Sequence, residues 1–468
     1  MNMPYNITKY FSILLISFIL ILPPAEAGSS VFGEFTISDE AELGEEAHRM
    51  IRSRLDVIED PEITGYIKDL ASRLAESAPP QPFPVTVDVV NHNAVNAFAT
   101  VAGYMVIFSG LILNMDTESE LASIIAHELA HITQRHIARN IERSKLISIG
   151  TLVGLLAGAF IGSEAGEAVA AGSIAGGQSA VLKYSREDEQ EADQVGLNFL
   201  VKAGFNPSGV VSAMEKMRKM QWFSGGEIPS YLSTHPGMDQ RTSYLQDRVN
   251  RLDQALLKRS DDNYRLRRVQ TLLRARYSSP SAAMTHFRDK KSDSCLGYLG
   301  KGIVNSRTHK IDQARENFEK LIECDDNDPL FLREAGIFYF QFGDLDTSAG
   351  LLQKAVMSSP RDTQAIIYYA RNLSEQGLLS DSISYLEKAL EILPENPLTH
   401  EHLARVHGKN KDNFMAHLHM AYARIFENNK TQARFHLDKA KSLAQGRQDK
   451  DKVKDLDNTY QKQAQYWK

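Results

Sequence analysis

The spacing of apolar and polar residues divides the chain into two regions. Between residues 38 and 202, helical stretches alternate with short strand-like ones that are rich in Val, Ile and Phe. After about Leu252 the spacing is helical throughout, and strand signals are absent. We therefore expect a mainly helical α+β domain with a small sheet over residues 28–255, followed by an all-α domain over residues 256–468.

Five segments of the first region have a clear period. Apolar residues recur at helical spacing in residues 38–75 and 118–142, which predicts helices, and a further helix is expected over about residues 186–202, closed by Gly204 and Pro207. Residues 83–90 and 96–109 have the alternation and the β-branched content of strands. Because these strands are short, helices should make up most of the domain.

The N-terminal segment has the pattern of a secretory signal peptide over residues 1–27. Lys9 precedes an uncharged run over residues 10–22, and Ala25-Glu26-Ala27 follows. A basic start, a short apolar core and an Ala-x-Ala site predict export and cleavage after about Ala27. An uncleaved anchor is the alternative, but the run is shorter than the roughly 20 residues that cross a bilayer. We expect a protein of the periplasm of a Gram-negative bacterium.

Charge and cysteine content exclude several classes of protein. Lys and Arg total 53 against 59 Asp and Glu, so the formal net charge of −6 leaves no basic surplus for nucleic acid. The two cysteines are too few for a disulfide-rich scaffold or a Cys₄ zinc site. With 43% apolar residues, the composition is that of an ordinary globular protein.

The strongest chemical signal is His127-Glu128-Leu129-Ala130-His131 in the predicted helix 118–142. Residues four apart share a helix face, so both imidazoles can bind one ion. Glu128 is placed to take a proton from an attacking water. The alternative is a helix with two surface histidines, but the apolar residues around the motif require this helix to pack in a core.

A third ligand is needed, and Glu189 is the best candidate. Glu189 and Asp193 lie four residues apart in the predicted helix 186–202, so they share one face. Glu189 would complete a His₂Glu set, and Asp193 would accept a hydrogen bond from a ligand imidazole. An acidic, solvated helix start is the alternative. His136 is one position short of the third His of the extended zinc motif, so we expect it at the surface or beside a ligand.

These two motifs together resemble a known family. His127-Glu128-x-x-His131, followed by Ser185-Arg186-x-x-Glu189-x-x-x-Asp193, resembles the gluzincin metallopeptidases of the HtpX and CAAX prenyl protease type. The resemblance implies a zinc metallopeptidase domain with one Zn²⁺ per chain. It assigns the metal to His127, His131 and Glu189, and it makes Glu128 the general base.

The same resemblance assigns residues around the metal. Thr234-His235-Pro236 and Arg241 match positions whose cations would stabilise the oxyanion of the tetrahedral intermediate. For His235, a turn residue before proline is one alternative, and a ligand that caps the zinc and keeps the enzyme inactive is another. Asn96-Ala97-Phe98-Ala99 matches an edge strand on which an extended polypeptide adds by backbone pairing, with an ordinary internal strand as the alternative.

An uncharged, Gly/Ala-rich insert separates the two motifs. It covers residues 146–161, and sixteen residues are marginal for crossing a bilayer. We interpret it as a flap beside the site that is mobile or that makes peripheral contact with a membrane. A buried helix is the alternative.

The all-α region repeats with a period of 34 residues. Gly302, Gly336, Ala370 and Ala404 are each 34 residues apart, and large apolar residues recur in register with them. This pattern resembles tetratricopeptide repeats, about four of them over residues 296–443. Such repeats form a concave surface for polypeptide segments or partner proteins.

Two cysteines fall within one repeat. Cys295 begins its first helix and Cys324 ends its second. Because the two helices are antiparallel, these ends lie near each other, and in the periplasm we expect a disulfide. A pair of buried thiols is the alternative.

A secreted gluzincin followed by such repeats resembles periplasmic proteases that assist the assembly of outer-membrane β-barrels. The resemblance implies unfolded or misassembled outer-membrane proteins as substrates, chaperone-like activity, and contact of the repeats with the barrel-assembly machinery. The alternative is a repeat-based chaperone or adaptor whose metal site is structural or latent. Glu128 favours the protease, because a structural zinc site needs no base.

Overall fold

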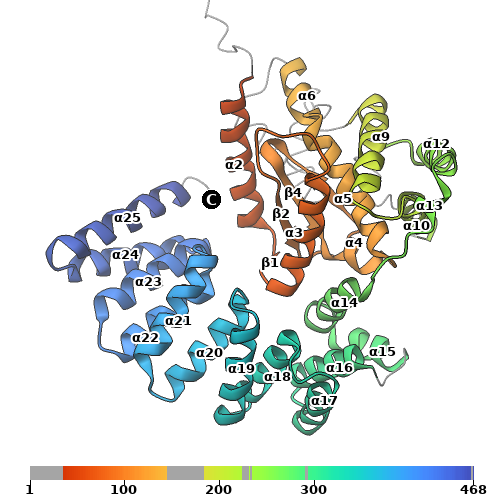
Figure 1. Ribbon diagram of the computed structural model, residues 1–468. Coiled ribbons are helices and arrows are strands. Elements are labelled where there is room, and N and C mark those ends of the chain that lie inside the picture. Colours follow the sequence, from red (N-terminus) through yellow and green to blue (C-terminus); the bar gives the residue numbers. More distant parts are fainter. Residues whose placement is uncertain are drawn as a thin grey trace, which may run out of the picture.

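The computed structural model describes residues 35–144, 184–223, 231, 235–289, 294–464 and 467 (Figure 1). The predicted signal peptide and the predicted flap at residues 146–161 lie outside these residues. The expected architecture is confirmed, because a mainly helical domain with a small sheet is followed by an all-α array of helix pairs.

The first half of the α+β domain contains the sheet. Helices α2 (Ile37–Arg54) and α3 (Pro61–Ala75) are separated by strand β1 (Val57–Ile58), whereas continuous helical spacing was predicted there. The break follows from Asp60, whose side chain caps α3, and from Pro61 in the first turn, where a missing N–H is tolerated. The remaining elements of this half are β2 (Thr86–Val90), β3 (Ala97–Ala99), η1 (Val101–Gly103), β4 (Tyr104–Phe108) and α4 (Ser109–Asn114).

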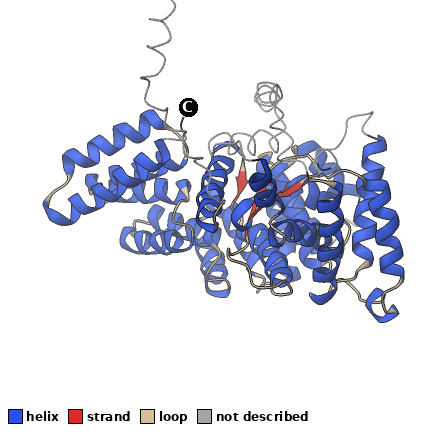
Figure 2. Ribbon diagram, turned by 90° about the horizontal axis from the view of Figure 1, so that it is seen from above, coloured by secondary structure: helices blue, strands red, loops and turns tan. Residues whose placement is uncertain are grey.

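Within the described residues the sheet has the strand order β1-β2-β4-β3, so β3 is an edge strand. Strands β2 and β4 are parallel, with Thr86 opposite Tyr104, and β3 is antiparallel to β4, with Phe98 opposite Val106. Figure 2 shows the strands surrounded by helices. The apolar runs of β2 to β4 are therefore buried in the domain core.

Helix α5 (Glu118–Thr133) is the central element of this domain. It contacts α3, β3, α9 (Arg186–Lys202) and α10 (Ser208–Phe223), so every residue from Glu118 to Ile132 is buried. Helix α12 (Met238–Asn250) packs on α9 and α10.

The single helix predicted over residues 118–142 is broken. Helix α5 ends at Thr133, and α6 (His136–Ser144) begins after a turn in which Arg135 has a φ of 52°. The Arg135 guanidinium binds Glu40 of α2 through Nε and Nη2, at 2.9 and 2.7 Å. A tertiary ion pair therefore holds this left-handed residue.

The second half of the chain is an array of helices. Their bounds are α13 (Gln254–Leu257), α14 (Tyr264–Tyr277), α15 (Pro280–Asp289), α16 (Cys295–Arg307), α17 (Ile311–Cys324), α18 (Pro329–Gln341), α19 (Leu345–Ser358), α20 (Thr363–Glu375), α21 (Leu379–Ile392), α22 (Pro397–Lys409), α23 (Asn413–Phe426), α24 (Lys430–Leu443) and α25 (Gly446–Ala464).

The 34-residue period is visible in the hydrogen bonds of this array. The Ser348 hydroxyl donates to the Gly336 carbonyl at 2.9 Å, and the Ser382 hydroxyl donates to the Ala370 carbonyl at 2.7 Å. Gly336 has no room for a side chain, because a Cβ there would lie 2.7 Å from Leu352. The small residues at this position of each repeat therefore allow the paired helices to approach closely.

The helix array contains the disulfide that was expected. Cys295, at the start of α16, and Cys324, at the end of α17, form a disulfide with Cα atoms 5.9 Å apart.

The array contacts the α+β domain near both of its ends. Arg268 of α14 donates to Glu62 of α3 at 2.7 Å. Asn428, between α23 and α24, donates to the carbonyl of Ser53 in α2 at 3.4 Å. The array therefore curves so that its last helices return to α2, as Figure 1 shows. Among the described helices, none combines the length and apolar character that a membrane span requires.

Candidate metal centre

Helix α5 places His127 and His131 on one face. Its first turn is fixed by Thr117, whose hydroxyl accepts the backbone N–H of Glu120. The ring atoms His127 Nε2 and His131 Nε2 lie 3.0 Å apart, and both side chains are buried. Nitrogens at this distance either share a proton or bind one cation together.

Helix α9 lies close against α5. Ser185 and Asp188 form a capping box at its start. Gly196 permits the close approach, because a Cβ there would lie 3.0 Å from the Ala126 carbonyl oxygen of α5. The side chains on this face of α9 therefore reach the two histidines.

Glu189 and Asp193 of α9 contact different sides of the imidazoles. Glu189 Oε1 lies 3.4 Å from His131 Nε2, and Glu189 Oε2 lies 3.5 Å from His127 Nε2. Asp193 Oδ1 lies 3.0 Å from the other nitrogen of His127, Nδ1. Glu189 thus faces the nitrogens that converge, whereas Asp193 can accept the outer N–H of His127 and fix its tautomer.

His235 is the fourth member of the cluster. Its Nδ1 lies 3.3 Å from His127 Nε2 and 2.8 Å from Glu189 Oε1. One donor atom from each of His127, His131, Glu189 and His235 lies within 4.8 Å of the others, and all four residues are buried. The position of His235 therefore suits both roles expected for it, a further metal ligand and a cation beside the metal.

The separations within the cluster fit a zinc ion. Donor atoms at the corners of a tetrahedron with bonds of 2.0–2.1 Å are about 3.3 Å apart. The closest separations here run from 2.8 to 3.5 Å. Imidazole nitrogen and carboxylate oxygen are also the donors that zinc takes in proteins. The residues present therefore suit the metal that the sequence implied.

Glu128 lies between this cluster and the sheet. Its Oε2 accepts the backbone N–H of Ala99 at 3.0 Å. Among the residues that the structure describes, its Oε1 has no hydrogen-bond partner and lies 3.5 Å from His235 Nε2, which also has none. Burial raises the pKa of Glu128. One oxygen is thus fixed by the backbone, and the other is available to a proton beside the cluster.

Arg241 of α12 binds the two carboxylates of α9. Its Nε and Nη2 donate to Asp193 at 2.8 and 2.7 Å, and its Nη1 contacts Glu189. Burial opposes the charge on Glu189, but His235 and Arg241 outweigh it and hold the pKa of Glu189 well below its ordinary value. All three guanidinium nitrogens face carboxylates, which suits positioning of Glu189 and Asp193 better than the oxyanion contact expected from the sequence.

The segment Asn96–Ala99 adjoins Glu128. Among the described residues, strand β3 pairs with β4 alone, and α5 packs against it. The N–H of Ala99 points away from β4 and donates to Glu128. Asn96, Ala97, Phe98 and Ala99 are all buried. The expected substrate-binding segment is therefore an edge strand beside the cluster.

Residues 59–249 match the family model described as Peptidase family M48. The chain contains an M48 peptidase domain. The matched range includes the whole cluster, Glu128 and Arg241. Because M48 is a metalloprotease family, a metal ion is expected at the four clustered residues of the M48 domain.

Two curated relatives extend the likeness beyond the M48 domain. The Beta-barrel assembly-enhancing protease of Escherichia coli (strain K12) is 29% identical over 316 residues, which cover 66% of this chain and 64% of the relative. The Putative beta-barrel assembly-enhancing protease of Vibrio cholerae serotype O1 is 32% identical over 315 residues, covering 66% and 65%. The chain thus spans slightly less than two thirds of the length of these relatives.

One solved structure matches about a third of the chain. It is YrrB, described as a TPR protein with an unusual peptide-binding site, which is 16% identical with a TM-score of 0.30. The match covers 36% of this chain and 92% of the YrrB chain.

Two tyrosines that sequence reasoning missed stack on histidines of the M48 domain. The ring of Tyr184 lies 3.7 Å from that of His131, and the ring of Tyr231 lies 4.3 Å from that of His235, centroid to centroid. Both tyrosines are buried. Tyr184 directly precedes the Ser185-Arg186 motif, and this adjacency was the only signal in the sequence.

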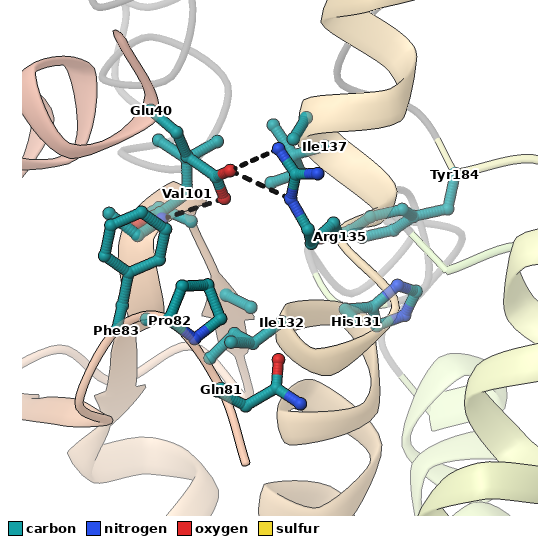
Figure 3. Close-up of a pocket in the computed structure, with 15 residues that line it drawn as sticks. Glu40, Gln81, Pro82, Phe83, Val101, His131, Ile132, Arg135, Ile137 and Tyr184 are labelled. Carbon is teal, nitrogen blue, oxygen red and sulfur yellow. Dashed lines mark hydrogen bonds and ion pairs between the residues drawn. The ribbon is translucent and has the colours of Figure 1, made fainter. Parts of the chain in front are cut away.

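A small pocket opens beside His131 and Ala99 of the M48 domain (Figure 3). Phe83, Val101 and Tyr184 line it, and the Glu40–Arg135 pair, drawn with dashed lines, bounds one side. The pocket therefore adjoins both the metal cluster and the edge strand.

Proposed function

We propose that the protein is a zinc-dependent endopeptidase of the periplasm that acts on unfolded or misassembled outer-membrane proteins. The observation that carries the proposal is the placement of Glu128. One carboxylate oxygen is held by the edge strand, and the other lies beside three buried histidines without a hydrogen-bond partner in the described part of the chain. A structural zinc site has no use for such a base.

The side chains and backbone have separate roles in this reaction. Zinc, held by His127, His131 and Glu189, would polarise the scissile carbonyl and make water a better nucleophile. Glu128 accepts the proton of the attacking water at Oε1 and passes it to the leaving amine. The edge of β3 would align an extended substrate by backbone pairing.

The location and the substrates rest on other observations. The N-terminal segment has the composition of an export signal. The names of the two curated relatives connect them with β-barrel assembly. The helix array would bind polypeptide segments of a substrate or of the barrel-assembly machinery, with chaperone-like effect.

A latent site is the second candidate, and the position of His235 favours it. His235 Nδ1 lies as close to the converging donors as a fourth ligand would. If His235 caps the metal, His235→Ala should keep its zinc and cleave an unfolded substrate faster. If His235 instead stabilises the oxyanion, the same variant should keep its zinc and cleave more slowly.

Degradation of a misassembled β-barrel protein in cells tests the main proposal. Cells with the wild-type chain should clear it, and cells with Glu128→Gln should not. Glu187→Gln is the matched control, because Glu187 is an exposed carboxylate on α9. Clearance that persists with Glu128→Gln would show that the proteolysis comes from elsewhere.

A further inference from the structure

A buried histidine continues the cluster on the far side of His131. His136 is 0% exposed, and its Nδ1 lies 2.7 Å from His131 Nδ1. Its other nitrogen, Nε2, lies 3.1 Å from Glu191 Oε2 and 3.8 Å from Asp188 Oδ1. Arg139 Nη2 contacts the same two carboxylates, at 2.8 and 3.4 Å. His136 thus connects a proposed metal ligand with a charged group on α9.

The hydrogen bonds that link His131, His136 and Glu191 allow one consistent arrangement of protons. If His131 Nε2 binds the metal, His131 Nδ1 keeps its proton and must donate it. His136 Nδ1 is the acceptor at 2.7 Å, so the proton of His136 lies on Nε2 and is donated to Glu191. Each ring nitrogen of the two histidines then has a partner, and each imidazole has a defined tautomer.

The break between α5 and α6 makes this contact geometrically accessible. In a continuous helix, residues five apart lie about 140° apart around the axis, so His136 would point away from His131. The left-handed φ of Arg135, 52°, changes the direction of the chain immediately before His136. The ion pair between Arg135 and Glu40 stabilises that conformation.

The same residues could be read as a second metal site, because donor atoms of His136, Asp188 and Glu191 lie within 4.8 Å of one another. Arg139 argues against that reading. Its guanidinium already pairs with both carboxylates, and it would repel a cation placed among them.

We propose that His136 is a positioning residue that, together with Glu191, fixes the tautomer and orientation of His131 for zinc binding. The inference rests on the proposed function, since it requires His131 to bind zinc through Nε2. Removing the hydrogen-bond partner of a metal-binding histidine typically costs 10- to 100-fold in metal affinity, and we expect a loss in that range.

Zinc affinity of the purified full chain, measured by competition with a chromophoric chelator, tests this inference. His136→Ala should bind zinc about 10- to 100-fold more weakly than wild type. His136→Asn should recover part of the loss, because its side-chain oxygen can still accept the His131 proton. Glu191→Gln should weaken binding less than His136→Ala. Glu187→Gln, on the same helix and exposed, should match wild type.

The outcomes separate this inference from the proposed function. A wild-type chain that binds no zinc overturns the proposed function. A wild type that binds zinc, with His136→Ala within twofold of it, overturns only the role of His136. Circular dichroism checks folding, and if His136→Ala does not fold, His136→Asn and Glu191→Gln carry the comparison. The visible spectrum of the Co²⁺-loaded chain should change in Glu191→Gln and not in Glu187→Gln.

Discussion

Asp60 and Arg333 are 273 residues apart in the sequence, yet their side chains form an ion pair of 3.1 Å in which neither is exposed. Asp60 also caps α3 of the M48 domain, and Arg333 of α18 also donates to Asp362 at 3.0 Å. Burial opposes the charge on Asp60, but Arg333 and Arg276 outweigh it and lower its pKa. This pair therefore joins the M48 domain to the helix array.

Loss of Arg333 should destabilise the whole chain. Arg333→Met leaves Asp60 buried without its closest cation, and breaking a buried pair in this way costs about 3–5 kcal/mol. The free energy of unfolding in urea measures the effect. Arg405→Met is the control, because Arg405 pairs with Glu401 at the surface and such pairs contribute less than about 1 kcal/mol. Equal effects of the two substitutions would contradict a structural role for the buried pair.

Arg241→Gln distinguishes positioning from direct catalysis. If Arg241 holds Glu189 and Asp193 in place, zinc affinity should fall about 10- to 100-fold. If Arg241 contacts the oxyanion, zinc affinity should stay unchanged while the cleavage rate falls about 10²- to 10³-fold. The contacts in the structure predict the first result. Arg248→Gln, exposed on the same helix, is the matched control.

His400 should make the last repeats sensitive to acid. Burial lowers its pKa to about 4, although its Nε2 lies 2.9 Å from the Pro394 carbonyl. An unfolded chain protonates His near pH 6.5, so protons favour the unfolded state as the pH falls from about 6.5 to 4. Stability is complete above this window, and about 2 kcal/mol should be lost at pH 5.

Urea unfolding at pH 8 and at pH 5 measures this loss. His400→Phe keeps an aromatic ring next to Tyr422 and removes the titrating group. Its stability should therefore depend less on pH than that of wild type. An unchanged dependence in His400→Phe would assign the acid sensitivity to other groups.

The disulfide should stabilise the first complete repeat. Cys295 and Cys324 are separated by 29 residues, and closing a loop of that length contributes about 3–4 kcal/mol in the chain-entropy model. Cys324→Ser should lose that amount in urea unfolding. Intact mass should rise by two hydrogens when the wild-type chain is reduced, and an unchanged mass would mean that the thiols are free.

Periodicity explains what the sequence could predict about the site. Residues four apart share a helix face, so the pairs His127/His131 and Glu189/Asp193 follow from helix geometry alone. The 34-residue period likewise predicts the repeats, because the same helix-packing positions recur in every unit.

The role of His136 could not be predicted in this way. The apolar residues from Leu121 to Ile132 recur at three- and four-residue steps, and neither Pro nor Gly follows before Glu142, so the sequence predicts one helix. The break depends on Glu40, which lies 95 residues before Arg135 in the sequence. No local pattern contains that contact. Strand β1 was missed for a similar reason, since two residues are too few to show an alternation.

Zinc content and proteolysis, measured together on the purified chain, test the central claim most directly. We predict one zinc per chain in both wild type and Glu128→Gln, because Glu128 is beside the metal and is not a ligand. Wild type should cleave casein, a chelator should abolish this activity, and Glu128→Gln should reduce it by about 10²-fold or more. A chain without stoichiometric zinc, or cleavage that Glu128→Gln and the chelator leave intact, would contradict the account.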